Sequence, residues 1–153
     1  MMNEEQLRNA FQAEYLLLQK VIEDFDGRVI TIKAWSVTFS LVAIAGSFAS
    51  HNSAVLIVSC VSALLFWFIE ANWKTFQYAY YERSDDIEEY FRGENKLDFP
   101  FQIGTSWYKR WKSGGIARLK WIMLWPHGAL AHVAVAALSL VFYLLVQFGA
   151  IKL

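Results

Sequence analysis

Three long runs of apolar residues alternate with polar segments, and they lie at residues 29–49, 54–72 and 125–151. A helix needs about 20 residues to cross the roughly 30 Å hydrocarbon core of a bilayer. The third run exceeds that length. The first two reach it if Lys33 and Glu70 lie just inside the interface and extend their charged ends outward. The pattern therefore predicts three transmembrane helices.

Two further helices are predicted outside the membrane. Residues 3–26 carry one apolar face at helical spacing, and Gly27 is expected to loosen the join to the first membrane helix. Residues 73–92 continue the second run without Pro or Gly until Gly93, and their apolar seam fits the face of 3–26 from the same chain or a neighbour. Residues 93–124 predict a loop followed by a basic interfacial segment.

The composition supports a membrane protein over a soluble one. The chain is 56% hydrophobic and 18% charged, whereas soluble domains average about 45–50% and about 25%. The alternative for the first two runs is a buried helical hairpin of a soluble protein. Aromatic residues flank both runs as interfacial belts do, which argues against it: Trp35, Trp67, Trp73, Phe76, Tyr78 and Tyr80.

The Lys and Arg residues are distributed unevenly around the three runs. Four lie before or at the start of the first run, nine between the second and third, none in the turn 50–53, and only Lys152 after the third. The positive-inside rule predicts a cytoplasmic N-terminus and cytoplasmic 73–124, with the turn and the C-terminus outside. The acidic first 27 residues predict no cleavable signal peptide.

These observations predict an all-α integral membrane protein that forms a single domain over residues 1–153. It has three transmembrane helices, a cytoplasmic amphipathic N-terminal helix and a cytoplasmic extension of the second helix. Small and hydroxyl residues form stripes on the first and third membrane helices, which allow close helix contact or line a pore. Because these stripes need protein neighbours, we expect a homo-oligomer or a subunit of a larger membrane complex. The stripe residues are Ser36, Ser40, Ser47, Ser139, Tyr143 and Gln147.

Three ionisable residues lie at similar predicted depth in the three membrane helices, namely Lys33, Glu70 and His132. Ionisable groups inside a membrane indicate function and require a partner. We predict an intramembrane polar cluster centred on Glu70 that gates a pore or senses protons, since histidine titrates near neutrality. The alternative is a structural ion pair, or a pair between Glu70 and Lys74 one turn on.

Five basic residues and no acidic ones occur between 109 and 120, interleaved with tryptophans. This pattern is typical of a segment at an anionic cytoplasmic leaflet, where each base adds on the order of 1 kcal/mol. The lipid bilayer is therefore an expected partner. A basic collar beside a membrane helix is ordinary, so no nucleic acid is expected. The lipid-surface residues are Lys109, Arg110, Lys112, Arg118 and Lys120.

The sequence contains little that indicates a metal site or an enzyme active site. His127 and His132 are five residues apart and do not share a helix face, and Cys60 is the only cysteine. There is no nucleophile elbow and no glycine-rich phosphate loop. We therefore expect no cofactor, no metal, no catalytic residue and no enzymatic activity.

Three stretches resemble small bacterial inner-membrane proteins and cover about a third of the chain: VIEDFDGRVITIKAWSVTFS, LLFWFIEANWKTFQYAYYER and IMLWPH. The order of segments also resembles SLATT-type proteins, in which a membrane hairpin follows an N-terminal helix and continues as a cytoplasmic helix. The third membrane helix departs from that pattern. The resemblance implies the bacterial inner membrane and a pore-forming effector.

The expected function is that of a non-enzymatic oligomeric inner-membrane protein, either pore-forming or channel-like. The alternative is a structural or accessory subunit that anchors a cytoplasmic protein partner through the helices 3–26 and 73–92. A pore predicts a polar-lined axis, whereas an accessory role predicts a closed bundle and an exposed apolar face outside the membrane. A membrane enzyme, the third alternative, predicts a pocket that joins Glu70 and His132.

Overall fold

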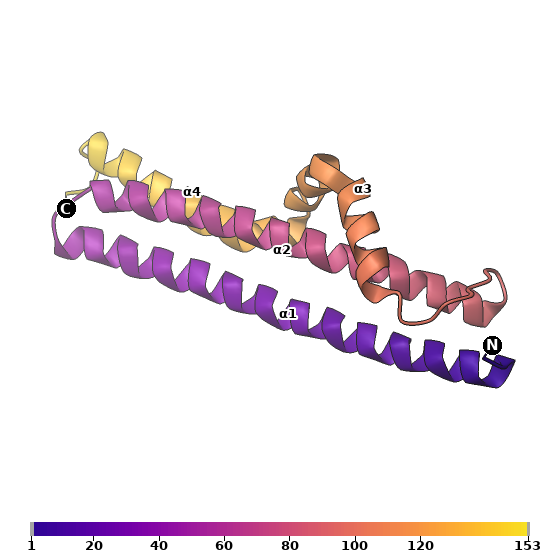
Figure 1. The fold of residues 1–153 in the computed structure, drawn as a ribbon. Helices are drawn as coiled ribbons and strands as arrows, with labels where there is room; N and C mark the ends of the chain where they lie inside the picture. The colour runs from indigo at the N-terminus through magenta and orange to yellow at the C-terminus, as the bar shows by residue number, and fades with distance from the viewer. Residues whose placement is uncertain (1, 153) are drawn as a thin grey trace. The chain divides into compact units, whose positions relative to one another are not determined.

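The computed structural model describes residues 2–152, which contain four α-helices and no β-strand. Helix α1 spans Glu4–Ala49, α2 Ala54–Arg92, α3 Ile103–Met123 and α4 Pro126–Gln147 (Figure 1). The predicted all-α class is confirmed. Helices α1, α2 and α4 are each long and apolar enough to cross a membrane, which is consistent with a multi-pass membrane protein.

The helix boundaries differ from the predicted ones in three places. Helix α1 continues through Gly27, where a loosened join between two helices was expected, and an added Cβ there would meet nothing within 4 Å. Helix α3 begins at Ile103, inside the segment expected as a loop, and Gly115 with a φ of 49° interrupts it. Helix α4 ends at Gln147, before the predicted end at residue 151.

The described chain divides into two compact units. Residues 2–28 and 73–119 form one, called here the polar unit, and residues 29–72 and 120–152 form the other, called the apolar unit. Two boundaries between the units, at 28/29 and 72/73, coincide with the start of the first apolar run and the end of the second. Each unit has its own buried core, so each can be described by itself.

The core of the polar unit forms where the first part of α1 packs on the last part of α2. Phe11 and Leu18 of α1 and Ile87 of α2 are completely buried. The ring of Phe11 lies 4.6 Å from that of Tyr90, measured between centroids. These residues come from the apolar faces that the sequence predicted for the two helices. Their pairing within one chain is therefore confirmed.

The apolar unit has small residues inside and large aliphatic residues outside. Ala63, Val135 and Ala136 form its core, with Val37 and Cys60 packed against them. Small residues at a contact let helices approach closely, as they do in membranes. Large aliphatic side chains cover the outside, which suits lipid better than water. They include Leu41, Val42, Ile57, Val58, Val61, Leu65, Leu130, Leu140 and Val141.

Candidate functional site

A cluster of ionisable side chains is buried in the apolar unit around Glu70 of α2. The Glu70 side chain is only 2% exposed, and the Lys33 ammonium of α1 lies 2.9 Å from its Oε1. From α4, His132 Nε2 lies 2.9 Å from Glu70 Oε2. The three residues that the sequence placed at similar depth are therefore in contact. The Glu70 carboxylate thus contacts Lys33 through Oε1 and His132 through Oε2.

A fourth residue completes the cluster on the far side of the imidazole. His132 is completely buried, and its Nδ1 lies 2.7 Å from the Oγ of Ser36. A neutral imidazole has one donor and one acceptor nitrogen, and a serine hydroxyl can act in either role. If Nε2 donates to Glu70, Nδ1 accepts from Ser36. The sequence assigned Ser36 to a helix-contact stripe and did not predict this role.

Local features of α4 bring His132 to the carboxylate. Pro126 occupies the first turn of the helix, where its missing N–H costs nothing. A Cβ added to Gly128 would lie 3.4 Å from Glu70 Oε1, an ordinary van der Waals contact, so the first turn of α4 passes next to the carboxylate. Trp67 Nε1 of α2 donates to the carbonyl of Met123 at 3.1 Å and fixes the chain just before α4.

The members of the cluster differ in their access to the surface of the unit. The Lys33 side chain is 25% exposed, while Glu70 and His132 are 2% and 0% exposed. The Lys33 ammonium is therefore the member of the cluster that can extend toward the surface of the unit.

Buried hydroxyl groups continue the polar interior of the same unit. Ser59 Oγ of α2 lies 2.8 Å from Ser139 Oγ of α4 and donates to the carbonyl of Ser40 at 3.2 Å. Ser139 also donates to the carbonyl of Val135 at 2.8 Å. Ser47 donates to a carbonyl of its own helix. The Oγ of Ser40 is buried without a hydrogen-bond partner among the described residues.

The two predicted polar stripes therefore meet inside one protomer. Ser36, Ser40, Ser47 and Ser139 are all completely buried, which makes them helix contacts. Toward the end of α4 the stripe residues become more exposed: Tyr143 is half-buried and Gln147 is exposed. The serines of both stripes are covered within the chain, so they do not by themselves require a homo-oligomer, which stays a prediction.

The structure decides against the alternative partner for Glu70. The ammonium of Lys74 lies 2.6 Å from Asp26 Oδ1 and donates to Gln77 Oε1 at 2.7 Å. Both contacts belong to the polar unit. Glu70 therefore pairs with Lys33 and His132, and the competing pair with Lys74 is absent.

A second buried ion pair lies in the polar unit and was not predicted from the sequence. Arg83 donates from Nε and Nη2 to the two carboxylate oxygens of Glu14, at 2.9 and 3.0 Å. The backbone N–H of Phe101 donates to the same carboxylate at 2.8 Å, and Arg83 also donates to the carbonyl of Phe99. One signal was available, because Glu14 follows Phe11 by three residues and lies on the apolar face.

The basic segment of α3 is divided between two roles. Arg110 binds the carboxylates of Glu82 and Asp86, and Arg118 binds Glu82 as well. An added Cβ on Gly114 would overlap the Arg118 side chain. These two arginines are therefore engaged with carboxylates of the same chain, and the predicted lipid-surface role of the segment stays a prediction. The remaining three bases of the segment are exposed: Lys109, Lys112 and Lys120.

A hydrogen bond to the same α2 surface raises the pKa of a tyrosine on α1. Tyr15 donates its hydroxyl proton to Glu88 at 2.9 Å. This bond to a carboxylate, together with burial, raises the pKa of Tyr15 above the usual value for a tyrosine. The acidic face of α2 thus supplies partners for Tyr15, through Glu88, and for Arg110, through Asp86.

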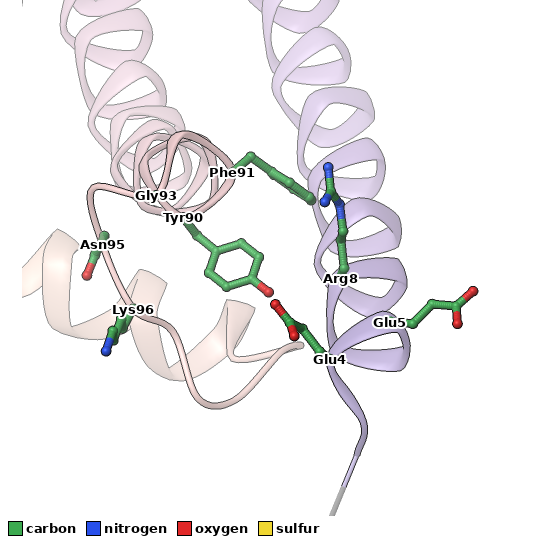
Figure 2. Close-up of a pocket in the computed structure, with 8 residues that line it drawn as sticks. All are labelled: Glu4, Glu5, Arg8, Tyr90, Phe91, Gly93, Asn95 and Lys96. Atoms are coloured by element: carbon green, nitrogen blue, oxygen red, sulfur yellow. The ribbon is translucent and has the colours of Figure 1, made fainter.

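Figure 2 shows an open cleft of about 630 Å³ between the beginning of α1 and the end of α2. The Arg8 guanidinium lies 5.7 Å from the centre of the Phe91 ring, and Glu4 points toward Tyr90. The charged groups on its walls have both signs, so they favour no class of charged ligand. Over residues 2–152, no three His, Cys, Asp or Glu side chains are grouped to hold a metal ion.

No protein-family model, curated protein or solved structure matches this chain. The SLATT-like resemblance and the bacterial inner membrane therefore stay predictions. The site rests on its own geometry, which joins a carboxylate, an ammonium, an imidazole and a hydroxyl in an apolar surrounding.

Proposed function

We propose that this protein is a non-enzymatic, channel-like membrane protein in which the cluster around Glu70 responds to protons. The observation that supports the proposal is that Glu70 is shared by two groups that can both be cationic, Lys33 and His132. Imidazole changes its charge nearer to neutral pH than any other side chain. Proton uptake by His132 would therefore compete with Lys33 for one carboxylate.

The hydroxyl groups supply the rest of the polar path. Ser36 contacts the imidazole, and Ser40, Ser59 and Ser139 follow within the same unit. A buried hydroxyl without a partner, as on Ser40, is a site where a water molecule can bind if space opens. In this proposal the closed state is the one described here, and release of Lys33 from Glu70 loosens the contact between α1 and α2.

The test is proton flux into vesicles that contain the purified protein and an enclosed pH-sensitive dye. We expect flux above that of empty vesicles, increasing as the external pH falls from about 8 to about 6. His132→Gln keeps a polar side chain of similar size and should abolish that pH dependence. His127→Gln is the matched control, because His127 is exposed and outside the cluster.

Three outcomes decide the proposal. Flux that depends on His132 and is unaffected at His127 supports it. Flux equal to that of empty vesicles, from protein that is folded by circular dichroism, overturns it. Equal flux in wild type and His132→Gln also overturns the role of the cluster.

A second function is favoured by one observation. The serines of the two stripes pair inside one protomer, and the interior described here is closed. A closed bundle is what an accessory subunit requires. Large apolar side chains on the polar unit, such as Leu16, Phe91 and Phe99, are exposed and available to a cytoplasmic protein partner. A folded protein without flux would favour this accessory role.

A further inference from the structure

A cleft of about 370 Å³ lies in the polar unit at the beginning of α3. Three basic side chains line it, from Arg83 of α2 and from Lys109 and Arg110 of α3. Thr105, Ser106 and Ser113 add hydroxyl groups, Gln102 adds an amide, and Asp86 is the only acidic residue in the wall. The wall is therefore rich in hydrogen-bond donors, and Lys109 is the basic side chain in it that has no acidic partner among residues 2–152.

The single carboxylate in the wall is already neutralised. Asp86 pairs with the Arg110 guanidinium, whose Nε donates to Ser106 Oγ at 2.9 Å. Arg83 is buried and held by Glu14, so its guanidinium is fixed as part of the wall. Asp86 consequently acts on a ligand less strongly than a free carboxylate would.

Two donors in the wall remain unused. The side chains of Lys109 and Thr105 make no hydrogen bond or ion pair with any residue between 2 and 152. They are four residues apart on α3 and so lie on one face, one turn from each other. Thr105 is in the first turn of the helix, where the backbone carries a partial positive charge, and Lys109 is in the second. An ammonium and a hydroxyl without protein partners thus line the same cleft.

We propose that this cleft binds a phosphate group. A phosphate has several acceptor oxygens and needs more than one donor, which the Lys109 ammonium and the Thr105 hydroxyl provide together. The site is separate from the cluster around Glu70 and does not depend on proton flux. The same phosphate chemistry is found in an anionic lipid headgroup and in a soluble phosphate.

The chain offers a matched control for this proposal. Lys112 is on the same helix as Lys109, is also exposed and carries the same charge, but does not line the cleft. Lys109→Gln and Lys112→Gln therefore remove equal charge from the surface. Only the first removes a donor from the cleft. If phosphate binds in the cleft, only Lys109→Gln weakens binding. If the surface merely attracts anions, the two variants weaken binding equally.

The experiment measures phosphate binding by the full-length protein in two arms. In the first, inorganic phosphate is titrated calorimetrically into protein in phosphatidylcholine nanodiscs at constant ionic strength. In the second, nanodiscs of equal phosphatidylglycerol and phosphatidylcholine are analysed by native mass spectrometry for retained phosphatidylglycerol. We expect Lys109→Gln to weaken binding about tenfold in at least one arm, as loss of a charged hydrogen bond predicts, and Lys112→Gln to change it less than about twofold.

The arms also identify the source of the phosphate. Dependence on Lys109 with inorganic phosphate indicates a soluble ligand, and dependence only with phosphatidylglycerol indicates a lipid headgroup. Equal losses in the two variants overturn the proposal, because they show surface attraction alone. Absence of binding by the wild type in both arms overturns it too. Thr105→Val, which keeps the side-chain shape, should weaken binding in the same arm as Lys109→Gln.

Discussion

The polar and the apolar unit each bury a glutamate, but they hold it in different ways. Glu14 receives two parallel bonds from Arg83 and a third from the Phe101 backbone. Glu70 receives one contact at each oxygen, from Lys33 and His132, and the Lys33 contact is an ion pair without hydrogen-bond geometry. A bidentate pair has a single geometry. A carboxylate shared by two separate groups can lose one and keep the other, so the second pair is suited to switching.

The largest effect is expected from breaking the fixed pair. Glu14→Ala leaves the buried Arg83 without its carboxylate and should destabilise the polar unit by about 3–5 kcal/mol. Hydrogen–deuterium exchange across 4–28 and 73–92 would measure it as faster exchange. Glu23→Ala is the control, because Glu23 is exposed on the same helix. Similar exchange in the two variants would contradict a structural role for Glu14.

A smaller effect is expected at the shared carboxylate. Glu70→Gln leaves Lys33 unpaired, but this lysine is partly exposed and can reach the surface, so the loss should be about 1–2 kcal/mol. Adding Lys33→Met should restore part of the stability, because no unpaired charge then remains. A double-mutant cycle on thermal unfolding in detergent would measure this coupling. Strictly additive losses would show that the two residues do not interact.

The smallest effect is expected from the buried hydroxyls of the apolar unit. Ser59→Ala removes the bonds to Ser139 and to the Ser40 carbonyl, but Ser139 keeps its bond to Val135. Hydrogen bonds between membrane helices contribute about 0.6 kcal/mol on average, and we expect a loss of that size. Unfolding in the same detergent, with the exposed Ser50→Ala as control, would measure it. A loss as large as that of Glu70→Gln would argue that these serines form one network with the cluster.

The sequence predicted the apolar unit better than the polar unit. Length and hydropathy predicted the three long apolar helices, and equal depth predicted the contact among Lys33, Glu70 and His132. Depth follows from helical rise, so it can be read from residue numbers. The rotation of each helix cannot be read in that way. For this reason the sequence missed the pairing of Ser36 with His132 and the burial of the stripe serines within one protomer.

The polar unit depends on contacts between distant residues. The Glu14–Arg83 pair and the binding of Arg110 to Glu82 and Asp86 link segments of opposite charge. Many acidic and basic residues are available in those segments, and spacing alone does not choose among them. A basic residue in the segment 109–120 can bind lipid or a neighbouring carboxylate, and only the three-dimensional structure shows which carboxylates lie within reach. The sequence therefore predicted five bases at the lipid surface and did not predict that two of them, Arg110 and Arg118, bind carboxylates of α2.

The imidazole of His132 is held at both nitrogens, between Glu70 and Ser36. Its ring cannot flip without breaking two bonds at once, whereas the Ser36 hydroxyl proton can rotate in place. A change in the charge of the ring can thus be absorbed at Ser36 without displacement of any heavy atom. At the opposite end of the cluster, the long side chain of Lys33 is partly exposed and makes a single ionic contact. The cluster is asymmetric, with an imidazole held at both nitrogens at one end and a partly exposed ammonium at the other.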